Sequence, residues 1–208
     1  ELLLLETFRG QIPDALFSEP YEVPATDGSG NIRENLLRAA ALLAEAGWVI
    51  TDGTLTNSEG TQMSIEFLLV SPAFERVVAP MVQNLQRLGI EGSIRIVDTA
   101  QYQNRLDDFD FDIIVVARGQ SLSPGNEQRG YWGSDFADTA GSQNFNGIKN
   151  PVVDSLIESL ISSPDRESLV TTAKALDRVL LWEHYVIPHW HIRSFRMVYW
   201  DIFGKPSI

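Results

Sequence analysis

The stretch from Gln62 to Asp98, QMSIEFLLVSPAFERVVAPMVQNLQRLGIEGSIRIVD, decides the fold. Its first part places an apolar residue at every second position, the period of a strand. These residues are Met63, Ile65, Phe67 and Leu69. Ser71 with Pro72 favours a helix start, and Gly89 favours its end before a second apolar run at 90–97. This order predicts two parallel strands joined by a right-handed helical crossover.

The residues before this unit predict one long helix. Asn31 can cap it, Glu34 follows three residues later as in a capping box, and Gly47 favours its end. Residues 1–30 are expected to form a short apolar helix followed by a proline-rich connector.

The residues after the unit predict a short helix from Asp98 through Tyr102 and then a third strand. Phe111–Ala117 is an apolar run typical of a strand buried on both faces. The next residues, 118–150, have little periodicity, and a long irregular stretch in a compact domain usually carries function. Four later elements are expected, namely helices over 151–162 and 164–183 and closing strands over Tyr185–Ile192 and Phe195–Trp200.

The composition limits the function classes. The chain has 208 residues, 44% of them hydrophobic, which is enough for a sizeable core. Its net charge of −12 argues against nucleic acid or an anionic membrane surface as a partner. No apolar run reaches the roughly 18 residues of a membrane span, so we expect no membrane insertion. Cysteine is absent, which excludes a disulfide framework, a thiol nucleophile and a thiolate metal site.

Two clusters of titratable side chains invite a catalytic interpretation. His189 and His191 would share one face of a strand, as in some zinc sites, but no H-x-x-x-H helix and no nearby carboxylate completes a ligand set. Asp108, Asp110 and Asp112 alternate along the entry to a strand, which favours a solvated face over a glycosidase carboxylate pair. We therefore expect no metal and no cofactor.

Two short motifs are incomplete versions of known sites. The glycine-rich turn at 26–31 lacks the preceding strand and the lysine of a phosphate-binding loop. Gly119–Ser123 follows a predicted strand as a nucleophile elbow does, but position 123 is serine where that motif requires glycine. Both are interpreted as loops.

The polar and aromatic segment from Arg118 to Phe145 remains the candidate site. It follows the carboxyl end of a predicted buried strand, where ligands of open α/β sheets bind. Amide and hydroxyl groups beside large aromatic rings suit reversible binding, and no general base stands out among them. The expected ligand-binding residues are Arg118, Gln120, Ser121, Leu122, Ser123, Asn126, Trp132 and Asn144. Trp132 is expected to pack on the ligand and to contribute little to stability.

Motifs along the whole chain support a family resemblance. They are A-x-x-L-L-x-E-A-G-W at 39–48, I-E-F-L-L at 65–69, Q-N-L-Q-R-L-G-I at 83–90, F-D-F-D-I-I-V-V at 109–116, N-P-V-V-D-S-L-I at 150–157 and V-I-P at 186–188. In this order they resemble the family-5 extracellular solute-binding proteins, the oligopeptide and dipeptide receptors of ABC importers. Residues 120–128 resemble the branch linked to import of microcin-C-type peptides.

The resemblance implies a fold and a function. The fold would be an α/β lobe of the type II periplasmic-binding-protein class, with a mixed sheet flanked by helices. The function would be to capture oligopeptides or peptide-like solutes in the periplasm and to deliver them to the permease of an ABC importer. Because family members are longer and this chain starts Glu1-Leu2 without a leader, residues 1–208 are expected to be a C-terminal lobe, with 193–208 returning toward the other lobe.

One position departs from the family pattern. An ungapped alignment from Phe111 places the aspartate that pairs with a peptide's amino terminus on Ser121. A buried ammonium without a carboxylate partner is costly, so we expect a preference for, or tolerance of, blocked amino termini held by Gln120 and Ser121. Two other function classes stay open, a metal-dependent hydrolase using His189 and His191 and an acidic protein-interaction domain.

Overall fold

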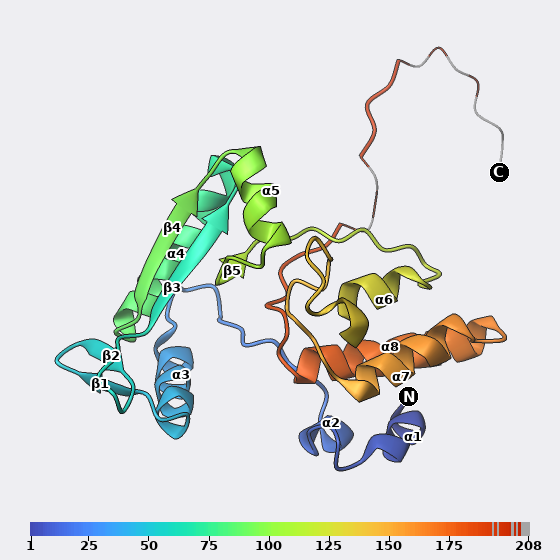
Figure 1. Cartoon of the computed structure of the whole chain (residues 1–208), viewed down its shortest axis with the longest axis horizontal. Helices are drawn as coiled ribbons and strands as arrows, with labels where there is room; N and C mark the ends of the chain where they lie inside the picture. Colours follow the sequence, from blue (N-terminus) through green and yellow to red (C-terminus); the bar gives the residue numbers. More distant parts are fainter. Residues whose placement is uncertain (193, 195, 201, 203, 205–208) are drawn as a thin grey trace.

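The computed structural model describes residues 1–192, 194, 196–200, 202 and 204 (Figure 1). A parallel sheet with its helices forms one part of the described chain, and a helical bundle forms the other (Figure 1). The polar segment that follows β5 runs from the first part to the second, so the candidate site lies where the two parts join.

The parallel unit is present as predicted. Strand β3 (Ser64–Leu69) is central, and β4 (Glu91–Ile96) and β5 (Ile113–Ile114) pair with it in parallel on either side. The crossover consists of the 3-10 turn η2 (Pro72–Phe74) and helix α4 (Glu75–Arg87). Helix α4 buries Val78 and Val82 against Phe67 and Leu69 of β3. Burial of these side chains fixes the helix on one face of the sheet.

A helix and a hairpin lie at the other end of the sheet. Helix α3 (Arg33–Glu45) precedes the antiparallel hairpin of β1 (Val49–Thr51) and β2 (Thr54–Thr56). The helix ends as predicted, because Gly47 has a φ of +86° and the next amide, of Trp48, donates to the carbonyl of Leu43 over 2.9 Å. Its start is one residue later than predicted. Ile32 takes the cap position, although Asn31 Oδ1 still accepts from the amide of Arg33.

Two expectations around β5 are wrong. Helix α5 (Thr99–Asp107) begins at its predicted cap, Asp98, but runs well past Tyr102. Strand β5 has two residues, and Val116 and Ala117 after it are exposed. The predicted strand over Phe111–Ala117 was to be buried on both faces, yet β5 lies at an edge of the sheet and pairs only with β3 among the described strands. An apolar run does not reveal how many neighbours cover it.

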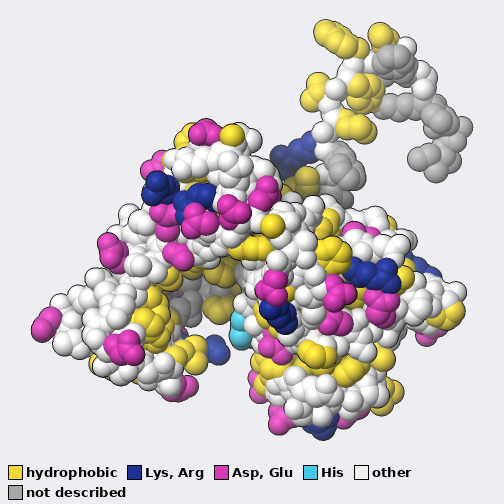
Figure 2. Space-filling model, in the orientation of Figure 1, with side chains coloured by type: hydrophobic (Ala, Val, Ile, Leu, Met, Phe, Trp, Pro, Cys, Tyr) yellow, Lys and Arg dark blue, Asp and Glu magenta, His cyan; other side chains and the backbone are white. Residues whose placement is uncertain are grey.

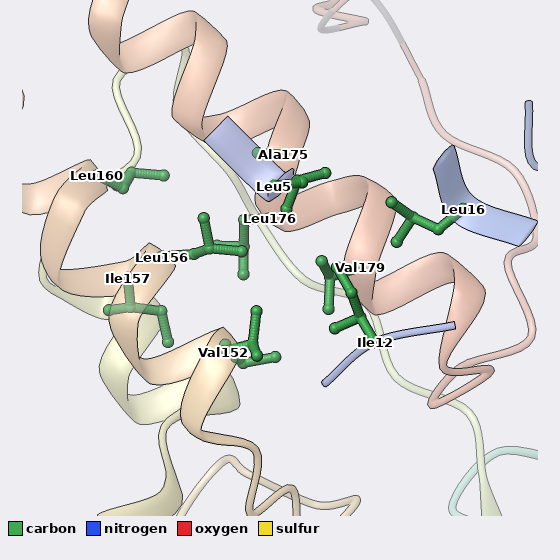
Figure 3. Packing of buried hydrophobic residues seen from close by; sticks show 11 residues of the cluster. Leu5, Ile12, Leu16, Val152, Leu156, Ile157, Leu160, Ala175, Leu176 and Val179 are labelled. Atoms are coloured by element: carbon green, nitrogen blue, oxygen red, sulfur yellow. The ribbon is translucent and has the colours of Figure 1, made fainter. Parts of the chain in front are cut away.

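The helical bundle contains the largest core (Figure 3). Its elements are α1 (Leu2–Leu5), η1 (Glu6–Phe8), α2 (Ala15–Ser18), α6 (Glu127–Trp132), η3 (Ser134–Phe136), α7 (Pro151–Ile161) and α8 (Arg166–Trp182). Leu5 and Leu16 are fully buried against Leu156 of α7 and Val179 of α8. The amino-terminal residues are therefore built into the core that α7 and α8 form.

The expected closing strands are not present. Residues 185–192 form no strand, and neither do residues 196–200; Phe195 lies outside the described residues. Ile187, Trp190 and Val198 are exposed. Alternating apolar residues become a strand only when another strand pairs with their backbone, and these residues pair with none of the described strands. The expected return of 193–208 toward another lobe falls partly outside the described residues.

No helix in the described part of the chain is both long enough and apolar enough to cross a membrane.

Candidate functional site

The candidate segment is held between the sheet and the bundle. Its first residues leave the carboxyl end of β5, and its later residues return to α5. The rings of Phe111 and Phe145 meet edge to face with centroids 6.4 Å apart, and the amide of Gly141 donates to the carbonyl of Asp107 over 3.0 Å. These contacts fix residues 118–145 against the end of the sheet where ligands of α/β folds bind.

Arg118 lies among aromatic rings. Its guanidinium carbon is 4.6 Å from the ring centroid of Tyr131, 4.3 Å from that of Trp132 and 5.6 Å from that of Phe145. Its Nη2 donates to the carbonyl of Gln143 over 2.8 Å, and its Nη1 is buried without a partner among the described residues. Burial lowers the pKa of Arg118. Contacts with the three aromatic rings offset this loss of solvation, so Arg118 keeps its positive charge within the candidate segment.

The carboxylate of Glu127 holds the loop between β5 and α6 through several hydrogen bonds. Its Oε1 accepts hydrogen bonds from the amide of Gly125 over 2.9 Å, from Gln120 Nε2 over 2.9 Å and from Gln128 Nε2 over 3.3 Å. The donor of Gln120, followed by that of Gly125, lowers the pKa of Glu127 to about 2. The carboxylate therefore stays ionised, and it holds the amide of Gln120 in one orientation.

The remaining loop residues are exposed. Ser121 Oγ donates to the carbonyl of Ser123 over 3.0 Å, and Leu122 is 85% exposed while its carbonyl accepts from Arg166. Asn126 Oδ1 accepts from the guanidinium of Arg129 over 2.9 Å. The structure thus gathers five of the expected binding residues on one accessible loop. They are Gln120, Ser121, Leu122, Ser123 and Asn126.

Asn144 has a different place from the one expected. Its side chain is fully buried, its Nδ2 donates to the carbonyls of Gly133 and Ile148, and its Oδ1 accepts from the amide of Ile148, each over 3.0 Å. All the strong hydrogen-bonding groups of the amide are directed at the chain itself. We therefore leave Asn144 out of the proposed ligand-binding set and assign it to the support of the loop.

Trp132 also belongs to the support of the site. It packs against the bundle core, its Nε1 donates to Gln128 Oε1 over 3.1 Å, and the guanidinium of Arg118 covers its ring. The chain of bonds from Trp132 through Gln128 to Gln120 links the core to the exposed loop. The sequence places Gln128 among the polar residues of the candidate segment and Glu127 as its nearest carboxylate, but it gives neither a role, because nothing local shows which side chains they contact.

The catalytic alternatives gain no support from the described residues. The ring of His184 lies 5.7 Å from that of Tyr21, and the ring of His189 lies 5.3 Å from that of Trp190. No group of three or more potential metal ligands comes together in the part of the chain that the structure describes. Asp110 pairs with Arg105 over 2.9 Å, and Asp112 accepts from the amide of Glu66 over 2.8 Å.

On the face of the molecule that Figure 2 shows, the acidic side chains do not gather in one place. Figure 2 shows acidic side chains spread over both halves of the visible face, several of them beside basic ones. A docking surface for a basic partner would instead gather one sign of charge.

Comparison with known proteins decides the family. The family model described as "Bacterial extracellular solute-binding proteins, family 5 Middle" matches residues 8–139. The chain belongs to this family. Two family relatives are "Uncharacterized protein y4wM" of Sinorhizobium fredii, 46% identical over 208 residues, and "Probable peptide-binding protein YejA" of Agrobacterium fabrum, 41% identical over 208 residues. Both alignments cover 100% of this chain. They cover 31% of y4wM and 34% of YejA, so the chain spans about a third of the length of these relatives.

A solved structure supports the fold. The chain resembles the oligopeptide-binding protein AppA of Bacillus subtilis, solved in complex with a nonapeptide, with a TM-score of 0.62 and 22% identity. The match covers 85% of this chain and 35% of AppA. The expected α/β class of periplasmic binding proteins is therefore confirmed. In the described residues, the parallel pairings and the antiparallel pairing lie in two separate sheets.

Proposed function

We propose that the chain is the C-terminal lobe of a two-lobed receptor that captures oligopeptides or peptide-like solutes in the periplasm. The receptor delivers them to the permease subunits of an ABC importer in the inner membrane. The observation that carries this proposal is an exposed, hydrogen-bonded loop, residues 118–126, at the carboxyl end of β5 in a chain of family 5.

The chemistry of the loop suits the capture of peptide groups. Gln120, Ser121, Ser123 and Asn126 offer neutral donors and acceptors, which match the amides of a peptide backbone. Within the described residues, the Ser121 hydroxyl bonds to the backbone of Ser123 and to no base, so nothing there activates it as a nucleophile. We infer reversible binding without catalysis, with Arg118 and Trp132 supporting the loop and with Leu122 contacting the ligand from the exposed tip.

The 208-residue chain alone should bind peptide poorly. Two-lobed receptors close around their ligand by a hinge, and one lobe leaves the other face of the ligand in water. We expect binding about 100-fold weaker than that of the full-length receptor. Isothermal titration of both proteins with the same peptides measures the difference.

Two outcomes would separate the parts of this proposal. Micromolar or tighter binding by residues 1–208 alone would contradict the two-lobed site. Absence of peptide binding by the full-length receptor, across a mixed library of di- to decapeptides, would contradict the peptide-receptor function itself.

The receptor should accept peptides whose amino terminus is blocked. Glu127 is the nearest carboxylate along the loop, and its Oε1 already receives three N–H donors, so Gln120 and Ser121 face the ligand as neutral groups. A neutral formyl group needs only ordinary hydrogen bonds, whereas a desolvated ammonium needs a carboxylate. An N-formylated peptide should therefore bind at least as tightly as its free counterpart.

The measurement is a titration of matched free and formylated peptides against wild-type receptor and Ser121→Asp. The new carboxylate should shift the preference toward the free amine by about tenfold. If wild-type receptor binds the free amine about tenfold more tightly, the expectation is wrong and another acid supplies the anchor.

A further inference from the structure

A hollow of about 380 Å³ lies beside α3, and a second, of about 320 Å³, lies beside α6 next to the candidate loop. The second hollow is lined by Glu127, Gly130, Tyr131, Phe136, Ser142 and Gln143. Of the lining residues, Tyr131 belongs to the polar and aromatic residues that the sequence singles out in the candidate segment, but none is among the eight expected ligand-binding residues. The rings of Tyr131 and Phe136 supply its apolar walls, and Glu127 is shared with the loop.

The shared carboxylate connects the hollow to the loop. Oε1 of Glu127 accepts hydrogen bonds from Gln120 and Gly125 of the loop over 2.9 Å each, and Glu127 is also one of the residues that line the hollow. A ligand whose backbone lies on the loop can therefore extend one side chain into the hollow without crossing the core. This step rests on the proposed peptide-binding function.

The charged groups near the hollow limit which kind of ligand side chain can bind there. Glu127 stays ionised because hydrogen bonds from the loop lower its pKa to about 2, and a second carboxylate beside it would be repelled. The guanidinium of Arg118 lies 4.6 Å from the ring centroid of Tyr131, so a cation on this ring would meet a like charge. The hydroxyl of Ser142 already donates to the carbonyl of Phe136 over 2.7 Å. Glu127 would attract a cation that Arg118 repels, and an uncharged side chain is the one kind that meets no like charge in these surroundings.

Gly130 keeps the hollow open. It lies within α6 and has no unusual φ, and a Cβ built at this position would meet no atom within 4 Å. A helix with glycine at an interior position is less stable than the same helix with alanine by about 0.5–1 kcal/mol, so helix formation does not require glycine here. The free space around the Cβ position shows that tight packing does not require it either. Gly130 is one of the residues that line the hollow, and its missing side chain leaves free space there.

We propose that this hollow is a ligand subsite for a large uncharged side chain, aromatic or aliphatic, and that Gly130 sets its size. The subsite is a determinant of specificity, and it adds one side-chain contact to the backbone contacts of the loop. A ligand with a large side chain at the matching position gains affinity by burying apolar surface on Tyr131 and Phe136.

The test fills the hollow from the protein side. Full-length wild-type receptor and Gly130→Leu are titrated with a peptide series in which each position carries Ala, Leu, Phe or Glu in turn. Wild type should prefer Leu or Phe over Ala by about tenfold at one position and should disfavour Glu there. Gly130→Leu should reduce that preference to about twofold while the affinity for the Ala peptide changes by less than about threefold.

Two further variants control for folding and for added apolar surface. Ala41→Leu places the same side chain on an exposed position of α3, away from the hollow, and should keep the preference of wild type. Gly130→Ala should give an intermediate preference. Thermal unfolding of each variant checks that the protein is folded.

The outcomes separate this inference from the receptor function. Peptide binding without any size preference, a preference for Glu, or a preference that Gly130→Leu leaves intact would each overturn the subsite. A uniform loss of affinity for all peptides in Gly130→Leu would overturn it as well. Failure of wild-type receptor to bind any peptide would instead overturn the proposed function on which the subsite rests.

Discussion

Asn144→Ala should lower the free energy of unfolding by about 3 kcal/mol, because it leaves several buried backbone groups without partners. The carbonyl of Gly133 and both the amide and the carbonyl of Ile148 bond to this one side chain. The site is fully buried, so water does not replace the lost bonds without a cavity forming. Urea denaturation of the 208-residue chain, followed by circular dichroism, measures the change.

The matched control is Gln143→Ala, one residue earlier. The side chain of Gln143 is exposed, and its contact with Arg118 uses the backbone carbonyl, which the substitution keeps. We expect a change within about 0.5 kcal/mol. If Asn144→Ala also stays within that range, the buried amide does not hold the loop, and Asn144 returns to the set of possible ligand contacts.

The sequence predicts well those elements whose signals are local. Alternation at Ile65 and Phe67, a serine and proline at the start of the crossover and glycine at its end each act within a few residues, and the structure confirms the unit that they predict. The helices expected over 151–162 and 164–183 are present as α7 and α8, and in the structure the side chains of Asn150 and Asp165 cap them by accepting from backbone amides. These patterns depend on backbone chemistry that distant residues do not change.

The errors come from elements that depend on distant partners. Phe111–Ala117 and Tyr185–Ile192 both have the apolar residues of strands, but the first forms a strand over two residues only and the second forms none in the described chain. Backbone groups form a strand only when another strand accepts their hydrogen bonds. The sequence of one segment does not contain that information.

The candidate site shows the same division. The position of the loop follows from the strand before it, and the structure places the loop there. The roles of individual side chains do not follow, because polar residues in an irregular segment look alike in sequence. Asn144 is fully buried and Gln128 is 6% exposed, whereas Gln120 and Ser121 are exposed. Only the fold shows which amides meet solvent.

Trp132→Ala should lower the free energy of unfolding by about 2–4 kcal/mol, which reverses the expectation of a ligand platform with little effect on stability. The indole packs against the bundle core, lies under the guanidinium of Arg118 and donates to Gln128 Oε1. Its removal creates a cavity, leaves Arg118 with fewer aromatic contacts and breaks the chain of bonds to Gln120. Urea denaturation measures the loss of stability, and peptide titration of the full-length receptor measures affinity.

Trp132→Phe separates packing from hydrogen bonding. Phenylalanine keeps an aromatic ring against Arg118 and the core but lacks the Nε1 donor to Gln128, so stability should fall by about 1 kcal/mol only. Because Gln128 in turn holds Gln120, peptide affinity should weaken in both variants, by more in Trp132→Ala. A Trp132→Ala receptor with wild-type stability and a tenfold or greater loss of affinity, about 1.4 kcal/mol of binding energy, would show that the indole contacts ligand directly.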